Sequence, residues 1–228
     1  AGVNALDIVR LQRHLLFIDL LTSPYKIIAA DVNNDKVVNA LDVVSMQRMQ
    51  LHLISEFPNN TSHRFVPMSH VFTGDPLVSN FPEEITIPNL NSDITNADFY
   101  GIKIGDLDDS YQPSTNIGNK LTSSDTVSVM LNRVYSLKNS IVKVPVTVRN
   151  FKNMAALEGT IHWDTTQLQF VKVGDFALSG MDDENFATPT HLGKDILTFS
   201  WTTGSLTGIS KDEDAIIFNL YFNSLLDE

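Results

Sequence analysis

The chain has 228 residues and no cysteine, which excludes disulfides, thiolate metal sites and a cysteine nucleophile. Its 27 Asp and Glu residues against 16 Lys and Arg give a formal charge of −11, and the cations form no cluster that would bind nucleic-acid phosphates. No apolar run approaches the roughly 20 residues that a membrane-spanning helix needs, whereas the length is sufficient for one large domain or two modest ones.

The N-terminal part of the chain contains an internal repeat. Residues 3–16 align without gaps to residues 38–51, and nine of the fourteen aligned pairs are identical. Each copy is predicted to be a loop that runs into a helix with one buried face, so that two similar halves pack face to face. The apolar residues assigned to this face are Leu6, Val9, Leu11 and Leu16 in the first copy and Leu41, Val44, Met46 and Leu51 in the second.

The second copy overlaps the stretch DVNNDKVVNALD, residues 31–42, which has side-chain oxygens at positions 1, 3, 5, 9 and 12. A twelve-residue calcium loop supplies its ligands in this register, with a backbone carbonyl at position 7. The expected Ca2+ ligands are Asp31, Asn33, Asp35, the carbonyl of Val37, Asn39 and Asp42. Position 6 usually holds glycine and here holds Lys36, at a cost of roughly 1–2 kcal/mol that should weaken the affinity. The alternative interpretation is a solvated Asp/Asn turn before a helix N-cap.

Only the second half of such a loop precedes the first helix. Asn4 and Asp7 match positions 9 and 12, whereas positions 1, 3 and 5 would lie before Ala1. We therefore expect this chain to be part of a longer protein.

Residues 1–53 resemble the dockerin domain, the duplicated F-hand calcium module of bacterial extracellular assemblies. In that family, loop positions 10 and 11 and the following helix contact a cohesin partner. The resemblance places this contact at Ala5, Leu6, Ala40 and Leu41. Because these residues are identical in the two halves, it implies that either half can dock; the alternative is that Leu6 and Leu41 belong to the core.

Residues 54–112 are rich in turns, and we predict an ordered extension with short strands. Its segments RFVP, FPE and DFYGIKIGD are similar to the extension that follows dockerin repeats in large bacterial surface proteins. We interpret Asp106, Asp108 and Asp109 as a solvated acidic turn, with a cation site as the alternative. Residues 113–123 have the composition of a linker.

From about residue 124 the apolar pattern changes to a period of two, which predicts several short strands in an antiparallel sandwich. Pro145 predicts an edge position or a bulge. Residues 124–228 resemble the cohesin fold through the WD, LQFV and LTFSW segments, which implies a jelly-roll β-sandwich with a further strand beyond this chain. Trp163 and Trp201 are expected in its core, and Thr126, in the triplet DTV, fits a bacterial O-glycosylation signal.

The predicted fold class is multidomain α + β: a small α-helical F-hand module, a loop-rich extension and an antiparallel jelly-roll β-sandwich. No GxSxG, HExxH, GxGxxG or P-loop motif is present, and we expect no enzyme. The predicted function is a calcium-stabilised scaffold or adhesion segment, able to form filaments, of a large secreted or cell-surface bacterial protein. Its expected partners are other proteins or copies of itself. The alternatives are a dockerin–cohesin module of an enzyme-carrying complex and a carbohydrate-binding sandwich.

Overall fold

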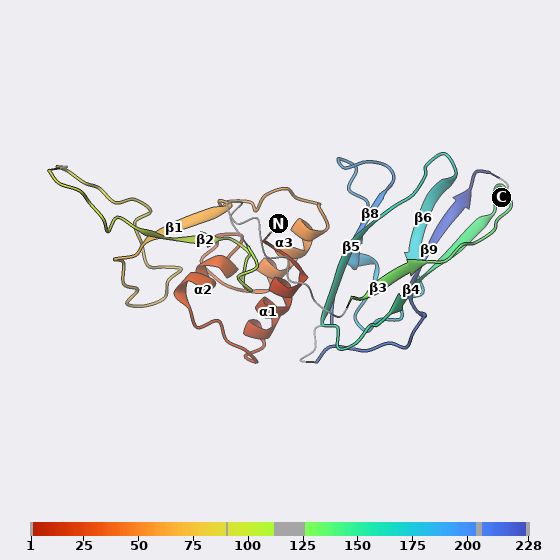
Figure 1. Cartoon of the computed structure of the whole chain (residues 1–228), viewed down its shortest axis with the longest axis horizontal. Coiled ribbons are helices and arrows are strands. Elements are labelled where there is room, and N and C mark those ends of the chain that lie inside the picture. The colour runs from red at the N-terminus through yellow and green to blue at the C-terminus, as the bar shows by residue number, and fades with distance from the viewer. Residues whose placement is uncertain (1, 90, 112–125, 204–206, 227–228) are drawn as a thin grey trace. The chain divides into compact units, whose positions relative to one another are not determined.

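The computed structural model describes residues 2–89, 91–111, 126–203 and 207–226. They form two compact units, one helical and one made of strands (Figure 1). The helical unit runs to Met49 and resumes at Ile54, and the strand unit takes in residues 50–53 and the described residues from Thr126 onward. The predicted linker, residues 113–123, lies outside the described residues. None of the described helices combines the length and the apolar character that crossing a membrane requires.

The helical unit contains three helices and a two-stranded sheet. The helices are α1 (Ala5–Leu15), α2 (Pro24–Ala30) and α3 (Ala40–Gln50). Helix α2 starts with Pro24 at its first turn, where the missing backbone N–H costs no helical hydrogen bond. The repeat thus forms α1 and α3, as predicted.

The buried face of the two repeated helices agrees only in part with the predicted one: Val9, Leu11, Met46 and Leu51 are buried as predicted, and the other four assigned residues are not. Ile8 and Leu11 of α1 and Met46 of α3 are fully buried, whereas Leu6 and Leu41 are 45% and 60% exposed. Leu16 and Val44, also assigned to the buried face, are exposed as well. The reason is helical geometry: Leu6 lies two positions before Ile8, which is roughly 200° around a helix of 3.6 residues per turn. The assignment of these leucines to the core was therefore wrong.

The extension completes the core of the helices. Its strands β1 (His63–Pro67) and β2 (Phe99–Lys103) pair antiparallel, and each contributes a side chain, Val66 and Ile102, to the cluster that contains Ile8. Ile104 and Leu107 follow β2 into the same cluster. The helices and the extension therefore share one hydrophobic core.

The strand unit is an antiparallel sandwich of two sheets. One sheet has the order β3-β4-β9-β6 and the other β5-β8-β7. The strands are β3 (Ser128–Leu131), β4 (Ile141–Arg149), β5 (Ala156–His162), β6 (Leu168–Gly174), β7 (Phe186–Ala187), β8 (Ile196–Thr202) and β9 (Ala215–Ser224), with a short 3-10 helix at Asp183–Asn185. Pro145 lies next to a register shift between Val146 and Thr147 of β4, so the predicted bulge is confirmed.

Aromatic side chains fill the core of this sandwich. Trp201 is fully buried among apolar side chains that include Phe151 and Phe218, and its indole N–H donates to the Ser179 carbonyl oxygen at 3.0 Å. Trp163 is half-buried and packs beside this cluster, where its ring stacks on Phe170 at a centroid distance of 5.4 Å. Both rings act as packing residues, as expected from their place in the strand pattern.

Candidate metal sites and docking residues

The loop of residues 31–42 folds around the carboxylate of Asp31. This side chain is only 3% exposed, and its two oxygens accept hydrogen bonds from the backbone N–H groups of Asp35, at 3.0 Å, and Lys36, at 3.1 Å. Asn33 Oδ1 also accepts from the Asp35 N–H at 3.0 Å, and Asn33 Nδ2 donates to Asp35 Oδ2 at 3.0 Å. Positions 1, 3 and 5 of the predicted loop are thus held close to one another.

Asp42 closes the loop from the first turn of α3. It is fully buried, and its Oδ1 accepts from the N–H groups of Val32 at 3.0 Å and Asn33 at 3.4 Å. Its Oδ2 accepts from the N–H of Asn39 at 2.9 Å, which caps the helix. Burial raises the pKa of Asp42 to about 6, since the negative charge has left water, and the neighbouring carboxylates add to this effect.

The donors of this loop fit calcium, a hard cation that binds carboxylate, amide and carbonyl oxygens. Asp31 and Asp42 are buried carboxylates whose charge a divalent cation would balance. Asn39 Oδ1 accepts from the Leu41 N–H at 2.7 Å as the helix cap. Because this oxygen is already engaged in the cap, Asn39 at position 9 would contact calcium through a bridging water, as is common at this position. The Val37 carbonyl, at position 7, accepts from Asn39 Nδ2 at 3.2 Å.

Lys36 occupies the sixth position in the left-handed conformation. Its φ is 73°, so the backbone turns at this position as a calcium loop requires, without the glycine that usually permits it. Its Nζ donates to Asn34 Oδ1 at 2.6 Å, which holds the ammonium group against the neighbouring amide.

Replacing Lys36 with glycine is expected to stabilise the calcium-bound helical unit by about 1 kcal/mol, because glycine adopts this φ without a Cβ penalty. Differential scanning calorimetry in calcium should show its unfolding midpoint raised by about 4 °C. The matched control is Lys36→Ala, which removes the same ammonium group but keeps the Cβ. An equal gain from both variants would contradict the assignment of strain to the backbone.

A second group of carboxylates surrounds the start of α1. Asp7 is fully buried, and its Oδ1 accepts from the N–H groups of Leu107 at 2.7 Å and Asp108 at 3.0 Å. Its Oδ2 accepts from the N–H of Asn4 at 2.8 Å, in the same capping arrangement as α3. Burial raises the pKa of Asp7 to about 7, and the nearby charge of Asp108 adds to the shift.

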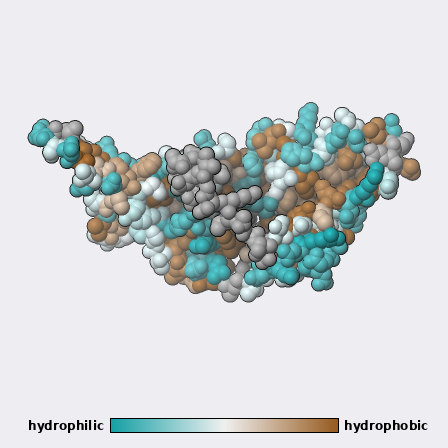
Figure 2. All heavy atoms as spheres, in the orientation of Figure 1, coloured by the Kyte–Doolittle hydropathy of each residue, from teal (hydrophilic) through white to brown (hydrophobic). Residues whose placement is uncertain are grey.

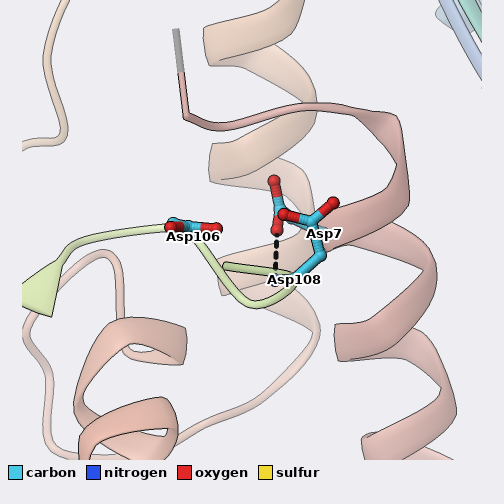
Figure 3. Close-up of side chains that lie close together, drawn as sticks. All are labelled: Asp7, Asp106 and Asp108. Carbon is cyan, nitrogen blue, oxygen red and sulfur yellow. Dashed lines mark hydrogen bonds between the residues drawn. The ribbon is translucent and has the colours of Figure 1, made fainter. Parts of the chain in front are cut away.

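Asp106 and Asp108 bring two further carboxylates to this position. Figure 3 shows the carboxyl groups of Asp7, Asp106 and Asp108 gathered between the start of α1 and the segment after β2. One oxygen of each lies within 4.8 Å of the other two, and among the described residues no other three His, Asp or Glu side chains meet this criterion. Asp106 is buried and Asp108 is half-buried, so the interpretation of both as solvated was wrong. Asp109 is exposed and pairs with Lys26 Nζ at 2.6 Å.

Sequence reasoning missed Asp106 and Asp108 as partners of Asp7, although a signal was present. The spacing of Asp106, Asp108 and Ser110 is that of positions 1, 3 and 5 in a calcium loop. The half-loop that completes this pattern, with Asn4 and Asp7, lies about one hundred positions earlier in the chain, so the sequence around Asp106 does not indicate it.

Three of the four predicted docking residues are accessible. Leu6 and Leu41 are 45% and 60% exposed, Ala40 is exposed, and Ala5 is buried. Figure 2 shows other hydrophobic residues at the surface of the molecule. In the helical unit, Phe17 is 85% exposed. The predicted glycosylation residue, Thr126, is exposed as well.

The helical unit thus contains paired loop–helix halves, and the strand unit is an antiparallel sandwich. The type I dockerin domain model matches residues 2–50, and the cohesin domain model matches residues 108–225. The second match spans more than half of the chain, which therefore belongs to the cohesin domain family and carries a type I dockerin domain before the cohesin part. Both are non-catalytic assembly modules that mediate protein–protein contacts.

Three solved structures illustrate the similarity. A type I cohesin–dockerin complex from Clostridium thermocellum is 15% identical, with 45% of this chain and 75% of that chain covered and a TM-score of 0.37. The sixth cohesin of scaffoldin B from Acetivibrio cellulolyticus, in complex with a dockerin, is 21% identical, with coverages of 43% and 70% and a TM-score of 0.37. A cohesin from Clostridium acetobutylicum is 22% identical, with coverages of 44% and 66% and a TM-score of 0.35. Comparison with curated proteins gave no match.

Proposed function

We propose that this chain is a non-catalytic, calcium-stabilised scaffold segment of a secreted or cell-surface bacterial protein. Its dockerin part docks a cohesin-type sandwich, supplied by another protein or by a second copy of this chain. The observation that carries this proposal is the exposure of Leu6 and Leu41, the equivalent residues of the two repeats. An extracellular setting follows from the typical occurrence of both modules in extracellular or surface complexes.

The repeat supports two equivalent docking modes. Leu6 and Leu41 each occupy the second position of a helix whose first turn is capped by an Asn–Asp pair. A cohesin that recognises one helix can therefore meet nearly the same surface after the dockerin part rotates by half a turn. Exposed leucines at these positions are apolar contacts that a partner would bury.

Calcium has a structural role in this proposal. The residues that would hold it are Asp31, Asn33, Asp35, the Val37 carbonyl, Asn39 and Asp42 in one loop, and Asn4 and Asp7 in the other. The ion would supply positive charge to buried carboxylates, while the chain itself positions these carboxylates through backbone N–H groups. The helix starts, and with them Leu6 and Leu41, are oriented by the same capping residues.

The carbohydrate-binding alternative has little support. Trp201 is fully buried, and the half-buried Trp163 packs against Phe170 and Phe222. The Trp201 ring is therefore closed to a sugar, and the half-buried Trp163 ring is already stacked on Phe170. Thr126 remains a proposed glycosylation residue, to be checked by mass spectrometry of protein from the native host.

Docking is tested with the full chain, immobilised in calcium and probed with purified type I cohesins and with soluble copies of the same chain. We expect Leu6→Arg and Leu41→Arg alone to change affinity less than about tenfold, because the other helix still docks. The double variant should lose at least about a hundredfold, which corresponds to loss of the apolar anchors of both modes.

The matched control is Val71→Arg, an equally large change at a 75% exposed residue of the same unit. Wild-type binding by the double variant, or no binding to any cohesin or to the chain itself, would contradict the docking proposal.

A further inference from the structure

We propose that the helical unit contains a second calcium site that is split across the chain. Asp106, Asp108 and Ser110 fill positions 1, 3 and 5 of a calcium loop that Asn4 and Asp7 complete at positions 9 and 12. This inference rests on the proposed calcium role of the dockerin part and adds ligands from outside the dockerin repeats.

The first half of the split loop repeats the backbone pattern of the intact loop. The two carboxylate oxygens of Asp106 accept from the N–H groups of Ser110, at 3.1 Å, and Tyr111, at 3.2 Å. These donors are the fourth and fifth residues after Asp106, as in the intact loop after Asp31. Asp108 Oδ1 accepts from the Ser110 N–H at 2.9 Å, the bond that position 3 makes to position 5 in the intact loop.

The second half closes the loop in the same manner. Asp7 Oδ1 accepts from the N–H groups of Leu107 and Asp108, which are positions 2 and 3, as Asp42 does in the intact loop. Asn4 Nδ2 donates to Ser110 Oγ at 2.9 Å and to Asp108 Oδ2 at 3.3 Å, so position 9 faces positions 3 and 5. The places that the sequence pattern assigned to residues before Ala1 are occupied in the structure by this downstream segment.

The break in the split loop falls between positions 6 and 7, and the two chain segments meet there. Tyr111 corresponds to Lys36 at position 6, and Gly2 corresponds to Val37, the residue whose carbonyl is the ligand at position 7. A Cβ on Gly2 would lie 2.7 Å from the Tyr111 ring, and Gly2 has a φ of 99°. Only glycine allows this close approach, so Gly2 is positioned to supply the missing carbonyl.

The internal repeat points independently to a metal at the same place, because it involves none of residues 106–110. The repeat of residues 3–16 and 38–51 assigns positions 9 and 12 of a calcium loop to Asn4 and Asp7 from their alignment alone. The match to the dockerin domain, a type that generally binds calcium, spans both repeats. Three carboxylates and a hydroxyl at this point form the oxygen-rich donor set that calcium prefers.

A metal in the split site would act as a cross-link. It would join the start of α1 to a segment that lies about one hundred positions later in the chain. Such a link stabilises the folded state, because the ion binds only when the two segments are together, and it holds Ile104 and Leu107 against the core of the helices. The extension would then supply calcium ligands to the dockerin part in addition to its contribution to the hydrophobic core.

The test counts the calcium ions bound to the full chain by native mass spectrometry and measures affinities by calorimetric titration. We expect two ions on the wild type, one on the Asp106→Asn/Asp108→Asn variant and one on the matched Asp31→Asn/Asp35→Asn variant. Two ions on the Asp106/Asp108 variant would overturn the split site. Loss of no ion from the Asp31/Asp35 variant would instead contradict the calcium assignment of the intact loop, so the two failures are distinguishable.

A single substitution tests the split site even if the double variant fails to fold. Gly2→Ala places a methyl group against Tyr111, and we expect it to weaken one of the two calcium sites at least about tenfold while the other is unchanged. The control is Gly74→Ala, since a Cβ on Gly74 would meet nothing within 4 Å. Identical titrations for Gly2→Ala and the wild type would count against Gly2 as part of the site.

Discussion

Removal of calcium with EDTA is expected to unfold the helical unit at moderate temperature and to leave the β-sandwich folded. Asp7 and Asp42 are fully buried, and burial raises the pKa of these groups to about 7 and about 6. Without a cation, ionisation of these buried carboxyl groups opposes folding at neutral pH, and metal-binding free energy is lost from folding. At a hundredfold excess over Kd, calcium contributes about 3 kcal/mol per site. The sandwich core around Trp201 is apolar and depends on no such charge.

Two optical signals separate the units. Both tryptophans of the chain, Trp163 and Trp201, lie in the sandwich, whereas the three described α-helices belong to the helical unit apart from the last residue of α3. Circular dichroism at the helical wavelength should lose its transition in EDTA, and tryptophan fluorescence should keep the same midpoint. Restoring calcium is the control and should restore the helical signal. A helical melting curve that EDTA leaves unchanged would refute a structural role for calcium.

Asp42→Ala is expected to destabilise the helical unit by about 3 kcal/mol, the second largest effect. The change leaves three backbone N–H groups, those of Val32, Asn33 and Asn39, without their acceptor. A buried unpaired donor costs about 1–3 kcal/mol, and loss of an N-cap box costs about 1 kcal/mol. Urea unfolding in calcium, followed by circular dichroism, measures the effect.

Two comparison variants separate cap from metal in this experiment. Asp42→Asn keeps an acceptor oxygen for the backbone but loses the charge, so it should cost less stability than Asp42→Ala while calorimetric titration shows calcium binding at this loop lost in both variants. Glu56→Ala, at an exposed position of the same unit, should lie within about 0.5 kcal/mol of the wild type. If the stability of Asp42→Ala also stays within about 0.5 kcal/mol of the wild type, the Asp42 carboxylate does not stabilise the helical unit.

Much of the fold could be predicted because the relevant patterns are local. The repeat predicted two capped helices, and the structure contains them at α1 and α3. The period of two after residue 124 predicted the sandwich, and Pro145 lies beside the bulge it was expected to mark. Lys36 adopts the left-handed conformation that position 6 of a calcium loop requires. In each case a few neighbouring residues determine the backbone, so spacing alone is informative.

Predictions that depended on distant contacts were less successful. Leu6 and Leu41 fit an apolar stripe in the sequence, but which helical stripe is buried depends on the rest of the core, which here includes Val66 and Ile102 of the extension. Asp106 and Asp108 looked like a solvated turn, because nothing near them in the chain indicates that Asp7 lies within reach.

The amino-acid sequence by itself therefore determined the intact loop of residues 31–42, the two capped helices and the individual strands of the sandwich, since the residues that form each of these elements are neighbours in the chain. Only the tertiary structure decided that Asp7 meets Asp106 and Asp108, and that Leu6 and Leu41 face outward. The physical reason is that the shared core of helices and extension brings together segments about one hundred positions apart. A half-loop at each end of the helical unit becomes one oxygen-lined site only when that core has formed.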